Sequence, residues 1–186
     1  MKMTCGVGAG LLAYYMIDKP DNPYDENFRD IEPIFLTAEQ IKAKTGVEYY
    51  KITDNVEENL SKIKKQRNYS YEDTVNISPL TMPEFDKKLE IFFTEHLHLD
   101  EEVRFILDGS GYFDVRDEND CWIRIRVAKG DLLILPAGIY HRFTVDNKKY
   151  IQARRLFVGE PVWTPYNRPA DDLEVRQAYL KTIKTC

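Results

Sequence analysis

The chain has 186 residues, which is long enough for one domain with a buried core and short for two. Its hydrophobic fraction of 43% and aromatic fraction of 12% are typical of a soluble globular protein. The 26 Lys and Arg are outnumbered by 31 Asp and Glu, so the net charge of -5 argues against a nucleic-acid partner.

The N-terminal stretch places one lysine before the apolar residues 6–17. A signal peptide has this order, but the stretch holds three glycines and two tyrosines, and no clear cleavage site follows, so none is expected. No run approaches the ~18 apolar residues of a membrane span. The glycine-rich run 6–10 follows no strand, which argues against a phosphate loop. Cys5, Cys121 and Cys186 form no CxxC pair and indicate a reducing compartment.

Helices are expected in the first part of the chain, up to about residue 95. Thr37 and Gln40 form a capping-box pattern that predicts a helix over residues 38–45, with a glycine directly after it. Asp54 and Glu57 repeat the pattern, and an apolar face over about three turns then predicts a second helix.

A third helix is predicted from Pro83, taken as its first residue, up to His96, because apolar residues recur at helical spacing between them. The basic residues at 62–67 are interpreted as a solvated helix face, and a nucleic-acid role for them is the weaker alternative.

After residue 96 the sequence changes to short runs of β-branched and aromatic residues separated by turn signals. The predicted strands cover residues 103–107, 112–116, 121–127, 132–135, 139–145 and 150–158. The stretch 109–111 is interpreted as a hairpin turn rather than a phosphate loop. Close, even spacing of the strands favours a barrel or jelly roll. A charged stretch over 171–181 can form a terminal helix.

The chain is therefore predicted to be mainly β, with a jelly-roll barrel preceded by short N-terminal helices. We expect a single domain over residues 1–186, acting as a monomer. Its helical N-terminal part covers about 1–95, its barrel core about 96–160 and its C-terminal tail 161–186.

The chain has only three histidines: His96, His98 and His141. His96 and His98 are two residues apart, so on a strand both point to one face, which in a barrel can be the interior. Glu102 can return a carboxylate to the same place, and a Pro–Gly turn can aim His141 there. Three imidazoles and one carboxylate suit a first-row divalent metal. Chance placement and a structural zinc site are weaker readings, because structural zinc favours cysteine.

The spacing of these residues matches two known motifs. His96-x-His98-x3-Glu102-x6-Gly109 resembles the first cupin motif, and Gly130-x5-Pro136-x-Gly138-x2-His141 resembles the second. Glu90 and Val145 replace the glycine and asparagine usually found near these motifs. Neither is a ligand position, so the predicted metal site is unaffected.

Longer segments, over residues 95–117, 136–145 and 155–163, resemble the acireductone dioxygenase family, and weaker matches lie at 14–16, 67–71 and 166–170. The likeness covers nearly the whole chain beyond the first dozen residues and is closest to the eukaryotic members. It implies a cytoplasmic enzyme of methionine salvage, and leaves nuclear entry open.

The resemblance also implies a reaction and a cofactor. The family oxidises 1,2-dihydroxy-5-methylthiopent-1-en-3-one, an acireductone, with dioxygen. With Fe²⁺ the products are 4-methylthio-2-oxobutanoate and formate, and with Ni²⁺ they are 3-methylthiopropanoate, formate and carbon monoxide. One ion per chain is expected on His96, His98, Glu102 and His141.

Strand parity suggests further residues of the site. Arg104 lies two after Glu102 and should share its face, and Arg155 alternates with apolar inward neighbours. An inward arginine needs an anionic partner, either the substrate enolate or Glu102, with a salt bridge to another acid as the equal alternative. Phe143 and Phe92 are candidates to contact the thioether tail, and for Phe92 core packing is the stronger reading.

Two other functions remain open from the sequence. One is a different cupin dioxygenase with the same ligands, such as one that cleaves a flavonol. The other is a metal-binding interaction protein that regulates a protein partner, a role that can coexist with catalysis.

Overall fold

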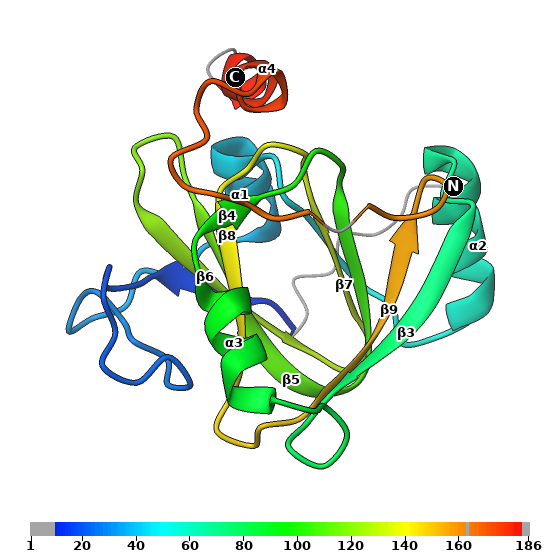
Figure 1. The fold of residues 1–186 in the computed structure, drawn as a ribbon, viewed down its shortest axis with the longest axis horizontal. Coiled ribbons are helices and arrows are strands. Elements are labelled where there is room, and N and C mark those ends of the chain that lie inside the picture. The colour runs from blue at the N-terminus through cyan, green and yellow to red at the C-terminus, as the bar shows by residue number, and fades with distance from the viewer. Residues whose placement is uncertain (1–9, 163, 184–186) are drawn as a thin grey trace.

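The computed structural model describes residues 10–162 and 164–183, and within them it is built mainly from antiparallel strands (Figure 1). The strands are β1 Leu12–Tyr15, β2 Glu48–Lys51, β3 Tyr71–Ile77, β4 His96–Leu97, β5 Glu102–Arg116, β6 Trp122–Ala128, β7 Asp131–Leu135, β8 His141–Val145, β9 Ile151–Phe157 and β10 Tyr166–Asn167. The helices are α1 Ala38–Thr45, α2 Val56–Arg67, α3 Phe85–Phe93 and α4 Glu174–Ile183. The predicted mainly β class is confirmed.

Strand β5 joins the two halves of the barrel. Its first part pairs with β7 and β9, and its second part pairs with β6 and β8. The outer strands extend each half: β2 pairs with β7 and β3 with β9, while β1 pairs with β6 and β4 lies between β8 and β10. Figure 1 shows β3 and β9 opposite β6 across the barrel.

The hairpin turn predicted at residues 109–111 is wrong, because these residues lie inside the continuous strand β5. The register with β9 shifts between Ile106 and Asp108, and Gly109 has a φ of +74°. A Cβ on Gly109 would lie 2.3 Å from the carbonyl oxygen of Tyr150. The glycine therefore permits a bulge and a close strand contact where β5 passes from one half of the barrel to the other.

The part of the chain predicted to be helical also supplies three strands, β1, β2 and β3, which pair with strands formed by later residues. These pairings cover edges that the later strands would otherwise expose. Part of the apolar stretch 6–17 is strand β1, and residues 1–9 lie outside the described residues. Cys5, Trp163 and Cys186 also lie outside them, and Cys121 is a free thiol.

The four helices match the predictions with two corrections at their starts. The capping box of α1 is formed by Thr37 and Gln40, and α4 lies in the charged stretch of the tail. The capping box expected at Asp54 is absent: α2 begins after Asn55, which has a φ of 48° and makes no side-chain cap. The third helix was predicted to begin at Pro83 and run up to His96, whereas α3 begins at Phe85, two residues after Pro83, and ends at Phe93.

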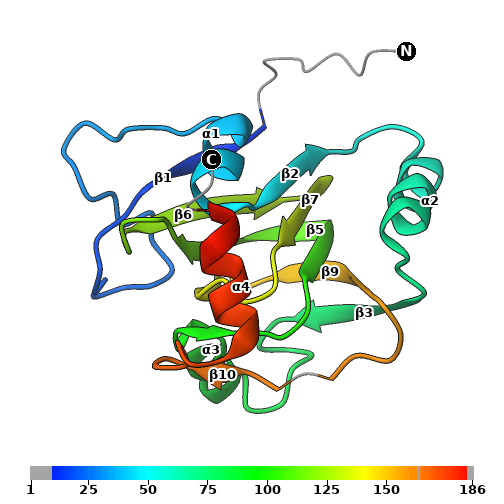
Figure 2. The same ribbon diagram turned by 90° about the horizontal axis from the view of Figure 1, so that it is seen from above.

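Strand alternation separates an inner from an outer apolar cluster. On β5, Ile106 faces the main core, whereas Val103 and Phe105 face a second cluster that Leu60 of α2 covers. Figure 2, seen from above, shows α4 in front of the barrel and α2 at its edge. The Tyr179 hydroxyl of α4 donates to the Thr45 carbonyl of α1 at 2.9 Å. None of the described helices has the length and apolar composition to cross a membrane. Several residues of the inner cluster, Ile106 among them, also line the cavity of the candidate site.

Candidate metal centre

The structure brings the three histidines together at one end of the barrel. His96 of β4 is paired with His141 of β8, and His98 follows two residues after His96. The ring centroids are 4.5 Å apart for His96 and His141, 4.9 Å for His96 and His98, and 5.3 Å for His98 and His141. One nitrogen from each ring lies within 4.8 Å of the others, a spacing at which the three can bind one metal ion.

The carboxylate of Glu102 reaches the same point. Its Oε2 lies 3.2 Å from Nε2 of His98 and 3.2 Å from Nε2 of His141. Glu102 is buried at the start of β5. The neighbouring Glu101 faces elsewhere, because it accepts hydrogen bonds from Arg67, at 2.9 Å, and from Tyr69.

Backbone carbonyls fix the orientation of all three imidazole rings. Nδ1 of His96 lies 2.6 Å from the carbonyl oxygen of Thr94. The matching distances are 3.2 Å from Nδ1 of His98 to the Thr164 oxygen and 3.0 Å from Nδ1 of His141 to the Ile139 oxygen. A carbonyl oxygen only accepts, so each Nδ1 carries the hydrogen and each neutral ring keeps a lone pair on Nε2. Hydrogen bonds of this kind set the tautomer of metal-binding histidines.

This arrangement fits a cation. In the neutral rings the Nε2 lone pairs of His98 and His141 face the anionic oxygen of Glu102. These electron-rich groups repel one another unless a proton or a metal ion lies between them. Three imidazole nitrogens and one carboxylate oxygen suit iron, nickel or another first-row divalent ion.

The electrostatics of the site favour the metal-binding forms of His96 and Glu102. Burial and the neighbouring His141 lower the pKa of His96 to about 4, so this ring is neutral at pH 7. Burial raises the pKa of Glu102, but Arg104 and the close contacts with His141 and His98 outweigh it and hold the pKa well below its usual range. For His98 the effect is opposite: burial lowers its pKa, but the contact with Glu102 outweighs burial and raises it, so metal binding has to compete with a proton on this ring.

A cavity of about 340 Å³ opens beside these ligands. Its volume is that of a small-ligand site, and its walls are mostly aliphatic and aromatic. Phe92 and Phe143, both predicted, lie on this wall with ring centroids 6.4 Å apart, and each also packs against the core. Phe113 completes the aromatic surface, 4.8 Å from Phe143.

The two predicted arginines both line the cavity but have different partners. Arg104 is buried and lies 3.2 Å from Oε1 of Glu102. Arg155 makes two hydrogen bonds to Asp73 of β3, at 2.6 and 2.5 Å. Arg155 therefore has an acidic partner on β3, as one of the two predicted alternatives requires, and it also lines the cavity. Arg154 points away and binds Glu57, as strand parity requires.

Several residues of the site were missed from the sequence. Val75 and Ile77 of β3 line the cavity, and Asp73 of the same strand binds Arg155; their alternation along one face of residues 71–77 was a readable strand signal. The carbonyl of Thr164 and the ring of Pro165 come from the C-terminal tail. A backbone carbonyl carries no sequence signal, so these contacts required the fold.

Comparison with known proteins identifies the family of the chain. Residues 12–165 match the family model described as the ARD/ARD' family. Acireductone dioxygenases of Branchiostoma floridae and Homo sapiens are 54% and 53% identical to the chain, each over 92% of the chain and 96% of the relative. A solved acireductone dioxygenase from Bacillus anthracis, with a cadmium ion in its active centre, shares the fold at a TM-score of 0.67 and 23% identity, over 85% of this chain and 99% of that one. The chain belongs to the ARD/ARD' family, the family of the acireductone dioxygenases.

Proposed function

We propose that this chain oxidises 1,2-dihydroxy-5-methylthiopent-1-en-3-one with dioxygen in methionine salvage, using one divalent ion. The single observation that carries the proposal is the convergence of three imidazole Nε2 atoms and the Glu102 carboxylate at the wall of a mostly apolar cavity. Relatives that are about half identical to the chain over nearly its full length bear the same activity in their names.

His96, His98, Glu102 and His141 would hold the ion. When bound, a divalent ion supplies Lewis acidity for an electron-rich enediolate and leaves coordination positions for it. We propose Fe²⁺ or Ni²⁺, because this nitrogen and oxygen donor set does not select strongly between them. The carbonyl acceptors of Thr94, Thr164 and Ile139 keep the three rings in the orientation that the ion requires.

The remaining walls of the cavity suit the two ends of the substrate. The guanidinium of Arg104, beside Glu102, offers positive charge where the anionic oxygens of an acireductone would lie. Phe92, Phe143 and Ile106 offer an apolar surface that can accept a thioether tail and keep water from the oxygens. Arg155 adds less charge than expected, because Asp73 neutralises it.

The proposal extends to the organisation of the protein. Residues 1–186 would form a single domain that acts as a monomer with one ion, in the cytoplasm.

Oxygen uptake tests the reaction. The protein is stripped with a chelator, and one portion is reloaded with Fe²⁺. We expect the reloaded protein to consume acireductone and dioxygen in equal amounts and the stripped protein to consume neither above background. A flavonol serves as the control substrate for a related dioxygenase activity. Faster uptake with the flavonol than with acireductone would replace the proposed substrate.

A further inference from the structure

The strand that carries the first histidine is short and depends on its neighbours. β4 consists of His96 and Leu97, and it is paired with β8 at a single position, His96 with His141. On its other edge it is paired with β10 at two positions, Tyr166 with Leu97 and Asn167 with His96. The C-terminal segment therefore supplies more of the ladder around β4 than the barrel does, and two paired residues alone are too few to fix a strand.

Arg168, the residue directly after β10, adds a second link to the same place. Its backbone nitrogen donates to the carbonyl of Glu95 at 3.1 Å, and its Nη1 donates to Oε1 of Glu95 at 2.8 Å. Nη1 and Nη2 also bind the two carboxylate oxygens of Asp120, each at 2.9 Å. One guanidinium thus joins the residue before His96 to the turn between β5 and β6.

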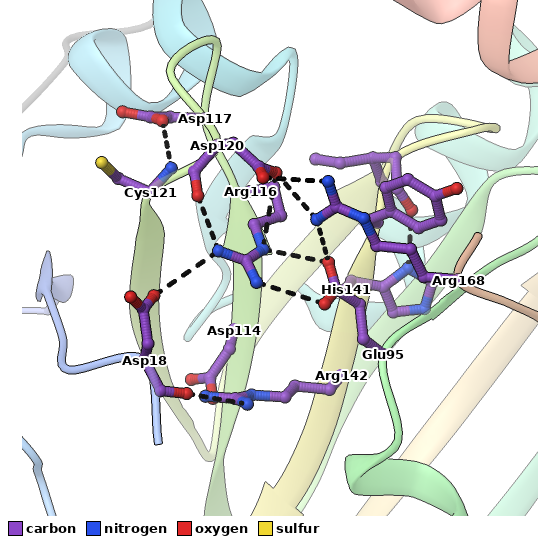
Figure 3. Close-up of polar contacts among 12 residues, drawn as sticks. Asp18, Glu95, Asp114, Arg116, Asp117, Asp120, Cys121, His141, Arg142 and Arg168 are labelled. Carbon is purple, nitrogen blue, oxygen red and sulfur yellow. Dashed lines mark hydrogen bonds and ion pairs between the residues drawn. The ribbon is translucent and has the colours of Figure 1, made fainter. Parts of the chain in front are cut away.

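Glu95 is anchored from the barrel side as well. Arg116 of β5 binds its two carboxylate oxygens, at 2.9 and 3.2 Å, and stacks on the Trp122 ring at 3.9 Å. Figure 3 shows Glu95 between Arg116 and Arg168, with Asp120 reached by both arginines. Charge-assisted pairs in fork geometry are the most directional side-chain contacts available to hold a backbone segment.

We propose that Arg168 is a positioning residue for the metal centre. By bridging Glu95 and Asp120, it holds β4 against β8, so that His96 and His98 present their Nε2 atoms to one ion. Arg168 acts through Glu95 and touches neither the ligands' Nε2 atoms nor the cavity. The inference rests on the metal centre of the proposed function, and adds to it a structural role for the tail, which also supplies the Thr164 carbonyl to His98.

The test uses the full-length chain loaded with Co²⁺, whose visible absorption reports the ligand geometry. The variants are Arg168→Ala, Arg168→Lys, Glu95→Gln and Asp120→Asn, and the rate of cobalt loss to excess chelator is measured for each. Arg154→Ala is the matched control, because Arg154 also binds a carboxylate in fork geometry, on β9 and away from β4.

Arg168→Ala and Glu95→Gln should speed cobalt loss by roughly 10- to 100-fold, the range by which metal affinity typically falls when a residue that supports a metal ligand is replaced. Both variants should also alter the cobalt spectrum. Arg168→Lys should recover part of the loss, since it keeps the charge but not the fork. Asp120→Asn weakens the other end of the bridge but leaves the pair of Arg168 with Glu95, so it should speed cobalt loss by less than Arg168→Ala does. Arg154→Ala should change neither rate nor spectrum.

A rate and spectrum of Arg168→Ala equal to those of the wild type would overturn the inference, as would an equal effect of Arg154→Ala. If Arg168→Ala does not fold, Arg168→Lys and Glu95→Gln decide by the same readouts. Wild-type protein that binds no cobalt would instead refute the metal centre itself, and this role of Arg168 with it.

Discussion

His96 lies directly opposite His141 where β4 meets β8, and their ring centroids are 4.5 Å apart. A directly opposed pair on neighbouring antiparallel strands places both side chains on one face of the sheet. The ligands at and before the start of β5 and the ligand on β8 thereby become a single site. This pairing leads to the first prediction.

Each of His96→Ala, His98→Ala and His141→Ala should lower metal content well below the one ion per chain expected for the wild type. No other histidine exists in the chain to replace the lost ligand. Emission spectroscopy of the purified, metal-loaded proteins measures the content. Full occupancy in any two of these variants would remove the ligand assignment.

The second prediction distinguishes three adjacent acids. Glu102→Gln should abolish turnover, because Glu102 is the acid that contacts His98 and His141. Glu101→Gln and Asp100→Asn should keep most of it, since the Glu101 side chain binds Arg67 and Tyr69 instead. Steady-state rates at saturating metal provide the comparison. An inactive Glu101→Gln with an active Glu102→Gln would mean that the register around β5 is different.

The third prediction concerns the arginine pair on β9. In Arg155→Ala the carboxylate of Asp73 loses its partner beside a cavity proposed to take an anion, so kcat/KM should fall by roughly 30- to 150-fold, equivalent to about 2–3 kcal/mol, with metal content retained. Arg154→Ala, on the opposite face, should lose little. Adding Asp73→Asn to Arg155→Ala should recover part of the activity. Equal losses in Arg154→Ala and Arg155→Ala would contradict this account.

The fourth prediction is a pH dependence of stability. The hydrogen bond from Arg155 is the main cause that lowers the pKa of Asp73 below its ordinary value of 3.8. A depressed carboxyl pKa contributes stability above the unfolded-state pKa, and that contribution is lost as pH falls through the folded-state pKa. Asp73→Asn should therefore cost about 1 kcal/mol or less at pH 7, and the difference from wild type should shrink below about pH 4. Urea unfolding at several pH values measures it, and a difference that grows on acidification would have the wrong sign.

Much of the site was predictable because its ligands are rare residue types at fixed spacing. The i and i+2 histidines and the inward position of Arg104 follow from strand periodicity, and the structure places Arg104 beside Glu102 as parity requires. The capping box of α1 is likewise local, since both its partners lie within one helical turn.

The rest depended on contacts between distant residues. The partner of Arg155 is Asp73, which lies in the part of the chain predicted to be helical, and nothing local to either residue identifies the other. Gly109 resembles a turn residue by composition, but its positive φ serves a bulge within β5. The pairing of β10 with β4 involves two residues on each strand, which is too short to leave a periodic pattern.

Product analysis with two metals tests most directly whether this one centre carries the dioxygenase reaction. The stripped chain is reloaded separately with Fe²⁺ and Ni²⁺ and given acireductone under oxygen, and headspace carbon monoxide is measured together with the organic acids. We predict 4-methylthio-2-oxobutanoate and formate from the iron form, and 3-methylthiopropanoate, formate and carbon monoxide from the nickel form. Carbon monoxide from both forms or from neither would contradict the metal dependence, and no consumption of acireductone by either metal-loaded form would contradict the function.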